Sequence, residues 1–130
     1  MTMNGQRDMQ YTTLGRTELK VSVAGLGCGG SGRLGQGRGA TTAHSIDVVC
    51  AALDAEVNFL DTAENYRTED IVGQAVFPSE RDGIVISTKT LIVKDGERCT
   101  PEQVVASLHS SLKRLNTERV EVFHLHAVAP

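Results

Sequence analysis

The chain has 130 residues, of which 40% are hydrophobic and 22% are charged, and its formal net charge is −3. This balance is typical of one globular domain with a hydrophobic core, and the lack of a basic excess argues against nucleic acid as a partner. The N-terminal MTMNGQRDMQ lacks the apolar core of a signal peptide, and no apolar run approaches membrane-spanning length. We therefore expect neither a nucleic-acid nor a membrane partner.

Cysteine usage indicates a reducing compartment. Cys28, Cys50 and Cys99 are odd in number and widely spaced, and no C-x-x-C pair occurs. This spacing fits neither a disulfide framework nor a zinc ribbon, and no metal site is predicted. We expect the protein to be cytoplasmic.

The first forty residues predict a hairpin and a glycine-rich loop. Residues 1–8 are polar and are expected to be flexible. MQYTTL (9–14) and ELKVS (18–22) flank a GRT turn, which is typical of a β-hairpin. VSVAGL (21–26) is predicted to be a strand, and residues 27–39 hold most of the glycine.

Apolar runs then alternate with helical patterns. Apolar residues at helical spacing predict a helix over 43–55. The elements that follow are a strand at 57–61, a helix from Thr68 to near Pro78, a strand at 83–88, a helix from Thr100 and a strand at 119–126.

Two helix starts have cap signals. Thr68 followed by Glu69 and Asp70 reads as a cap with acids in the first turn, and TPEQ (100–103) has the pattern of a capping box with proline at the first helical position. The expected buried face of the second helix consists of Val105, Leu108, Leu112 and Leu115.

Alternating strands and helices predict a parallel sheet, because each helical crossover returns the chain to the same end of the sheet. The two common folds of this kind are the open doubly wound sheet and the closed (β/α)8 barrel. No signal divides the chain into domains.

The stretch GLGCGG (25–30) matches the G-x-G-x-x-G pattern of dinucleotide-binding turns. A true turn of that kind opens directly into a helix and is followed by an acid about 20 residues on. Here the next helix is expected near residue 43, and Asp61 is the first acid that ends a strand. We interpret the stretch as a flexible loop that borders a ligand rather than as a dinucleotide turn.

Titratable residues finish three successive predicted strands. They are Asp61, Lys89 and His126, and Tyr66 follows Asp61 by five residues in DTAENY. The carboxyl ends of parallel strands form the edge that carries active sites, so these side chains are expected to meet there. Each also has an ordinary structural interpretation: a turn cap for Asp61, solvent exposure for Lys89, and core packing for His126 and Tyr66.

Such a cluster suits acid chemistry on a carbonyl. An ammonium about 4 Å from a phenol favours the phenolate by roughly 4 kcal/mol at an effective dielectric near 20, and a carboxylate keeps that ammonium charged. An imidazole can donate a hydrogen bond to the same carbonyl oxygen. None of these groups supplies a hydride, so a reductase would need a bound cofactor.

The motifs LGRTELKVS, NFLDTAENY, VISTK and SLKRLNTERVEVFHLH, in this order from about Tyr11 to Pro130, resemble the N-terminal half of an aldo-keto reductase. The resemblance implies the first half of a (β/α)8 barrel with an N-terminal hairpin, about four parallel strands and three helices. The domain would occupy residues 9–130 and be truncated after strand four. It also implies reduction of aldehydes or ketones to alcohols with NADPH, or with NADH.

Residue by residue, the resemblance places the family's catalytic tetrad on Asp61, Tyr66, Lys89 and His126. Tyr66 would protonate the carbonyl, Lys89 and Asp61 would tune it, and His126 would orient the substrate. Gly27 and Cys28, together with Asp61, would border the cofactor.

The sequence departs from the family at two points. Glu56 stands where the family usually has glycine, and Cys28 stands where it often has threonine. A (β/α)8 barrel also needs about 250 residues, and the missing half is the one that carries most NADPH contacts in the family.

Without that second half, we expect the 130-residue chain to be inactive alone and to self-associate through open sheet edges. Two alternatives remain: a non-enzymatic interaction protein on the same scaffold, and a nucleotide-binding module built on the glycine-rich loop.

Overall fold

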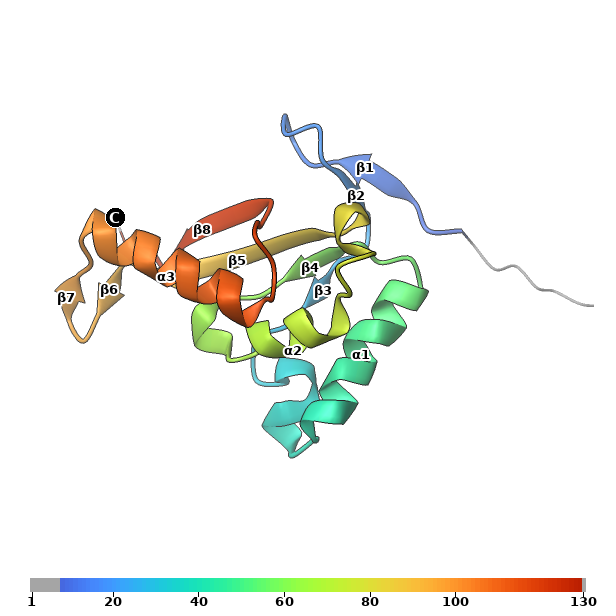
Figure 1. Ribbon diagram of the computed structural model, residues 1–130, viewed down its shortest axis with the longest axis horizontal. Coiled ribbons are helices and arrows are strands. Elements are labelled where there is room, and N and C mark those ends of the chain that lie inside the picture. Colours follow the sequence, from blue (N-terminus) through green and yellow to red (C-terminus); the bar gives the residue numbers. More distant parts are fainter. Residues whose placement is uncertain (1–7, 130) are drawn as a thin grey trace, which may run out of the picture.

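The computed structural model describes residues 8–129, which form a four-stranded sheet, three α-helices and two small hairpins (Figure 1). The segment expected to be flexible, 1–8, lies outside the described residues except for Asp8. None of the helices in residues 8–129 has the length and apolarity needed to cross a membrane.

The strands are β1 (Tyr11–Thr13), β2 (Lys20–Ser22), β3 (Leu26–Gly27), β4 (Phe59–Asp61), β5 (Val85–Leu91), β6 (Val93–Lys94), β7 (Glu97–Arg98) and β8 (Val122–His126). The α-helices are α1 (Thr42–Asp54), α2 (Glu69–Ala75) and α3 (Pro101–Arg114). Short 3-10 helices are η1 (Arg33–Arg38), η2 (Glu64–Tyr66) and η3 (Arg81–Gly83).

The central sheet has the order β3-β4-β5-β8, and every neighbouring pair is parallel. Each strand therefore lies beside the next large strand of the chain, and helices α1, α2 and α3 form the crossovers between them (Figure 1). The predicted alternation and the predicted parallel sheet are confirmed. This arrangement brings the carboxyl ends of all four strands to one edge.

The β1–β2 hairpin is attached through Asn58 to the other end of the sheet, where the strands begin. The amide of this side chain donates to the carbonyls of Lys20 and Gly83, and its oxygen accepts from the Ser22 N–H at 2.7 Å. The backbone N–H of Asn58 donates in turn to the Ser22 hydroxyl. One side chain thus connects the hairpin, the start of β4 and the turn before β5.

The predicted strand at 21–26 is wrong as a single element. Val21 and Ser22 belong to β2 of the hairpin, and the Val23 N–H continues that pairing by donating to the Gln10 carbonyl. The chain then bends, and β3 contains only Leu26 and Gly27. Alternation within one apolar run cannot reveal that its two ends pair with different sheets.

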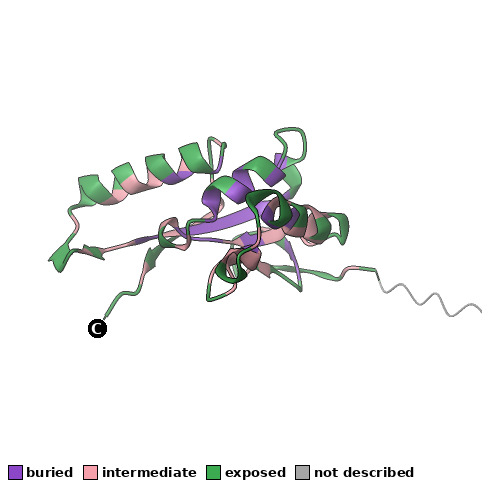
Figure 2. Cartoon of the chain, turned by 90° about the horizontal axis from the view of Figure 1, so that it is seen from below, coloured by how far each residue is buried: buried purple, intermediate pink, exposed green. Residues whose placement is uncertain are grey.

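The hydrophobic core lies between the sheet and the helices. Figure 2 shows helix α3 exposed on its outer surface and more buried toward the sheet. The core cluster includes Leu60 of β4, Ile86 of β5, Val49 of α1, Ile71 of α2, and Leu115 at the end of α3. Gly73 permits close packing of α2 on α3, because a Cβ atom there would lie 2.4 Å from the Arg114 carbonyl oxygen.

A buried carboxylate joins three elements of this layer. Glu69 of α2 is 1% exposed, accepts from the Thr88 hydroxyl of β5 and pairs with the Arg114 guanidinium of α3 at 2.7 Å. Both carboxylate oxygens are therefore partnered, which offsets the cost of burying the charge.

The two cap predictions have different outcomes. Thr100 forms the predicted capping box with Gln103. Thr68 precedes α2 but makes no side-chain cap, because its hydroxyl instead bonds the Cys28 carbonyl and the Thr62 hydroxyl. Sequence alone cannot distinguish a cap from a hydroxyl that bridges two loops.

The predicted buried face of α3 is only partly correct. Leu115 is buried, and Leu108 and Leu112 are half-buried, but Val105 is 51% exposed. Figure 1 shows the N-terminal end of α3 beside the β6–β7 hairpin, beyond the end of α2. The helix therefore packs on the sheet mainly through its C-terminal half.

Helices α1 and α3 end in the same backbone motif. After α1, the N–H groups of Glu56 and Val57 donate to the carbonyls of Leu53 and Ala52, and after α3 the N–H groups of Asn116 and Thr117 repeat the pattern. This is the Schellman arrangement, which needs a left-handed residue. Glu56 has φ 64° and Asn116 has φ 50°. Asparagine tolerates this conformation, whereas glutamate is strained.

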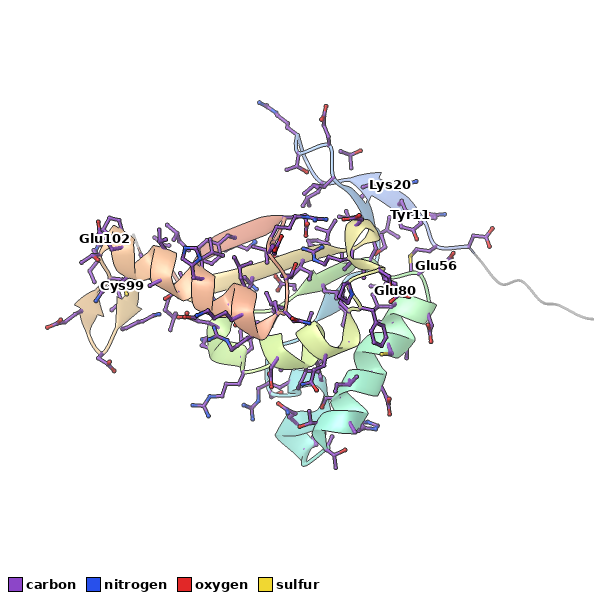
Figure 3. The ribbon with its side chains drawn as sticks, viewed as in Figure 1. Tyr11, Lys20, Glu56, Glu80, Cys99 and Glu102 are labelled. Atoms are coloured by element: carbon purple, nitrogen blue, oxygen red, sulfur yellow. The ribbon has the colours of Figure 1, made fainter. Side chains whose placement is uncertain are left out.

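Glu56 also receives a contact from the hairpin. The Tyr11 hydroxyl donates to its backbone carbonyl at 3.0 Å, and Figure 3 shows the two residues near each other. The carbonyl does not depend on the side chain, so replacing the side chain leaves this bond in place.

We predict that Glu56→Gly raises the free energy of unfolding by about 1 kcal/mol, because glycine adopts positive φ without a Cβ clash. Glu56→Ala is the matched control, since it removes the carboxylate and keeps the Cβ atom. Denaturant titration of the three proteins measures the effect. Equal stabilisation by both variants would assign the cost to the carboxylate rather than to the backbone.

Candidate active site

The register of the sheet places Asp61, Lys89 and His126 on one face. Asp61 pairs with Ser87, and His126 pairs with Leu91. Ser87, Lys89 and Leu91 are two residues apart along β5, and alternate residues of a strand share a face. Leu60 and Ile86, one residue out of phase, belong to the core under the helices. The three titratable side chains therefore project from the face opposite the helices.

Lys89 does not end its strand as predicted. Strand β5 continues to Leu91, because Thr90 and Leu91 pair with Leu125 and His126 of the neighbouring strand. Asp61, Lys89 and His126 consequently lie at successive levels: Asp61 is level with Ser87, Lys89 is two residues further, and His126 is level with Leu91.

Lys89 and Asp61 form the central ion pair. The ammonium donates to both carboxylate oxygens at 2.7 Å and to the Thr62 carbonyl at 2.8 Å. An ammonium has three N–H donors, so these three acceptors satisfy it. Its side chain is 13% exposed, against 43% for Asp61. The ammonium is thus largely enclosed, while the carboxylate with which it pairs is partly open to solvent.

Ser87 supports the same carboxylate. Its hydroxyl, on a residue that is 1% exposed, donates to Asp61 Oδ1 at 2.9 Å. Sequence reasoning missed this residue and the Thr62 carbonyl. The signal for Ser87 was available: it stands two residues before Lys89 in VISTK and must share its face.

Tyr66 lies in η2, in the loop that follows β4. Its ring centroid is 5.0 Å from the Lys89 ammonium and 5.8 Å from the centroid of the His126 ring, with the two rings at 87°. The contact with Lys89 is therefore made by the face of the ring. All four predicted site residues lie in one cluster, although they come from three strands and a loop.

His126 presents an unpartnered nitrogen. Its Nδ1 is buried and has no hydrogen-bond partner among residues 8–129. A buried polar atom without a partner is rare in proteins and often marks a functional position. Because this nitrogen is enclosed by the described residues, a ligand reaches it only if the surrounding side chains move.

His124 lies two residues before His126 and is level with Lys89. It is exposed. Strand β8 is an edge strand within the described residues, so nothing described there covers this side chain.

The glycine-rich loop follows β3 and lies beside this cluster. No α-helix begins in it: η1 follows, and α1 starts at Thr42. Gly27 is exposed and pairs with Asp61. Cys28 is fully buried, its N–H donates to the Asp61 carbonyl at 2.8 Å, and its carbonyl accepts from Thr68. Of the two candidate cofactor residues in the loop, only Gly27 is open to a ligand, and Cys28 offers no accessible side chain.

A hollow of about 600 Å³ lies next to the cluster, between η2, the β6–β7 hairpin and α3. The ion pair between Lys94 and Glu64 stands at its wall. Neither Tyr66 nor Lys89 lines this hollow, so it is separate from the cluster of candidate catalytic side chains. Among the described residues, no group of three or more His, Cys, Asp and Glu side chains is placed to hold a metal ion.

Burial raises the pKa of the Cys28 thiol to about 12 from 9.0; the Asp61 carboxylate adds to this effect, and the Lys89 ammonium opposes it. The neutral thiol is therefore favoured by the folded state. The stability that this preference contributes is complete below about pH 9 and is lost as the pH rises toward 12.

We predict that Cys28 reacts with iodoacetamide at pH 8 far more slowly than Cys99, because the thiolate is the reactive form and Cys28 is inaccessible. Cys99 is half-buried and serves as the internal control. Peptide mass spectrometry after timed labelling measures both rates, and labelling in denaturant should make them equal. Equal rates in the native protein would contradict the buried position of Cys28.

Comparison of the sequence with known proteins points to one family. The model of the Aldo/keto reductase family matches residues 26–130. Aldo-keto reductase YhdN of Bacillus subtilis (strain 168) is 31% identical over 126 residues, covering 91% of this chain and 38% of YhdN. A probable voltage-gated potassium channel subunit beta of Oryza sativa subsp. japonica is 35% identical over 132 residues, covering 91% of this chain and 37% of that protein. The chain thus spans less than two fifths of the length of these curated relatives.

Solved structures agree. The thermostable aldo-keto reductase Tm1743, in complex with the inhibitor epalrestat, has a TM-score of 0.75 at 27% identity, covering 94% of this chain and 44% of that one. The holo form of aldo-keto reductase AKR11C1 from Bacillus halodurans has a TM-score of 0.72 at 26% identity, covering 90% of this chain and 40% of that one. These proteins are (β/α)8 barrels, which confirms the predicted fold class: residues 8–129 form part of such a barrel. By its sequence, its parallel sheet and the order of its elements, the chain belongs to the aldo/keto reductase family.

Proposed function

We propose that the chain provides the proton-donating half of an NAD(P)H-dependent reductase that converts aldehydes or ketones to alcohols. The observation that carries this proposal is the cluster of Tyr66, Lys89, Asp61 and His126 on one face of the sheet. The relatives named as aldo-keto reductases support the reaction class. The substrate is a small carbonyl compound, and we propose a cytoplasmic location from the three free cysteines.

Tyr66 is the proton donor in this proposal. As a carbonyl carbon accepts a hydride, its oxygen gains negative charge, and the Tyr66 hydroxyl transfers its proton to that oxygen. The phenolate left behind is stabilised by the Lys89 ammonium, which pairs with Asp61. The product is an alcohol, and the tyrosine regains its proton from solvent.

His126 orients the carbonyl in this proposal. Its ring meets the Tyr66 ring edge-on, so a ligand oxygen near the phenol is also near the imidazole. A hydrogen bond to the carbonyl oxygen would stabilise the charge that develops there.

A nicotinamide cofactor fits the residues beside the cluster. Gly27 is exposed at the carboxyl end of β3 and has no atom within 4 Å of the position of a Cβ, which leaves room for a flat ring. Gly27, the backbone of Cys28, and Asp61 would border the cofactor. When bound, the nicotinamide supplies the hydride. We propose NADPH as the cofactor, with NADH as the alternative.

Residues 8–129 contain four of the eight strands of a complete barrel. Strands β3 and β8 are the two edges of the described sheet, and Leu125 of β8 is 55% exposed. Open parallel edges with apolar side chains favour association with other strands. We therefore propose that the 130-residue chain alone lacks activity and self-associates.

The proposed role of Tyr66 can be tested in the longest polypeptide encoded by the reading frame that contains residues 1–130. Tyr66→Phe should lower kcat for aldehyde reduction by about 10²–10⁴-fold, the usual contribution of a general acid, and leave NADPH binding unchanged. Tyr11→Phe is the matched control, because Tyr11 is the other tyrosine and lies on the hairpin. Steady-state kinetics and fluorescence titration of NADPH make the measurements. Full activity of Tyr66→Phe would exclude Tyr66 as the donor.

A further prediction concerns the 130-residue chain by itself. Purified and incubated with NADPH and an aldehyde, it should show no turnover above background, and light scattering after gel filtration should show species larger than a monomer. Turnover at ordinary enzyme rates by a monomer would refute both parts of this expectation.

A non-enzymatic interaction protein is the second candidate. It is favoured by the plant relatives of Oryza sativa and Arabidopsis thaliana, which are named as probable voltage-gated potassium channel subunits beta and are 35% and 36% identical. The third candidate is a nucleotide-binding module on the glycine-rich loop. Tight NADPH binding by the 130-residue chain that persists in Tyr66→Phe and is lost in Gly27→Ala would favour the third candidate over the first.

A further inference from the structure

The Tyr66 ring lies directly against the backbone of Gly29. A Cβ atom added at Gly29 would be 2.4 Å from Tyr66 Cε2, 2.6 Å from Cδ2 and 2.7 Å from Cζ. Real Cβ atoms do not approach other heavy atoms so closely, so a side chain at this position and the present ring position exclude each other. The φ angle of Gly29 lies outside the left-handed region, so the requirement for glycine comes from the ring and not from the backbone.

The loop cannot move away from the ring without losing the two hydrogen bonds that join Cys28, the residue before Gly29, to other segments. The Cys28 N–H donates to the Asp61 carbonyl at 2.8 Å, and the Cys28 carbonyl accepts from the Thr68 hydroxyl at 3.0 Å. The Gly29 carbonyl accepts from the Arg33 N–H at 3.2 Å. Because Asp61 and Thr68 flank the segment that carries Tyr66, these bonds fix the loop relative to that segment.

The ring, by contrast, can move. Tyr66 is half-buried, and its described neighbours besides Gly29 include the Lys89 ammonium and the edge of the His126 ring. A methyl group at position 29 would therefore push the ring rather than the loop. The displaced ring would leave its present position beside Lys89 and His126.

We propose that Gly29 is a positioning residue for the proton donor: its missing side chain allows the Tyr66 ring to lie beside Lys89 and His126. The proposal rests on the proposed role of Tyr66, and it assigns a purpose to the glycine-rich loop that differs from phosphate binding. The loop acts as a surface on which the phenol lies, and Gly29 acts through Tyr66 without touching the substrate.

The loop offers a matched control for this effect. Gly32 is in the same loop, has φ −79°, and has no atom within 4 Å of the position of a Cβ. An alanine there is unstrained and touches nothing. Gly29→Ala and Gly32→Ala therefore make the same chemical change with and without the contact to Tyr66.

The first test is kinetic and uses the same long polypeptide as the Tyr66→Phe experiment. Gly29→Ala should lower kcat by about 10²-fold, the cost of misplacing a catalytic group by about 1 Å, with NADPH binding unchanged. Gly32→Ala should retain the parent kcat. An unchanged kcat in Gly29→Ala overturns the proposal.

The second test does not need activity. Thermal unfolding is measured for Gly29→Ala, Tyr66→Ala and the double variant. Gly29→Ala should lower Tm in the parent, and this loss should vanish or become a gain in the Tyr66→Ala background, because the opposing ring is then absent. Equal shifts in both backgrounds overturn the proposal, since the cost would then lie in the loop itself.

The two tests also separate this proposal from the proposed function. If Tyr66→Phe retains full activity but the unfolding experiment shows coupling, Gly29 seats Tyr66 and Tyr66 is not the donor. If Tyr66→Phe is inactive and the Tm shifts are additive, the donor stands and the role of Gly29 fails.

Discussion

The parallel register of β4, β5 and β8 determines where every strand-borne side chain of the candidate site lies. Asp61 is level with Ser87, and His126 is level with Leu91, so both share the face of Lys89. A shift of one residue in either pairing would turn one of these side chains toward the helices. The register is fixed in turn by the opposite face, where Leu60 and Ile86 are buried under α1 and α2. Core packing on one face thus positions polar chemistry on the other.

The segment between β4 and α2 is held by a small set of polar contacts. Lys89 bonds the Thr62 carbonyl as well as Asp61, and Thr68 bonds Thr62 and the Cys28 carbonyl. These contacts join the ends of β3, β4 and β5, and the Tyr66 ring lies against Gly29 and near Lys89. Thr62 therefore contributes twice. Its carbonyl accepts from the Lys89 ammonium, and its hydroxyl contacts Thr68, which holds the glycine-rich loop beside the Tyr66 ring.

Most elements could be predicted because their signals are local. The capping box at Thr100, the helical spacing in α1 and the β-branched run of β5 each require only neighbouring residues. Glu56 was noted in the sequence as a departure from the family's usual glycine, and its left-handed backbone, with φ 64°, is found in the structure. The errors share a cause. The two ends of residues 21–26 pair with different sheets, Thr68 bonds a loop 40 residues away, and Val105 lies beyond α2, none of which local sequence records.

The sequence by itself determined which residue types stand at the carboxyl ends of successive strands, since strand periodicity and strand order follow from the chain. Tertiary structure alone decided that Lys89 contacts the Tyr66 ring by its face, that Ser87 and Thr62 complete the ion pair, that the Cys28 thiol is buried and that Gly29 lies under the phenol. These contacts join residues that are 23–37 positions apart in the chain, and the distances between such residues are set by the packing of helices on the sheet.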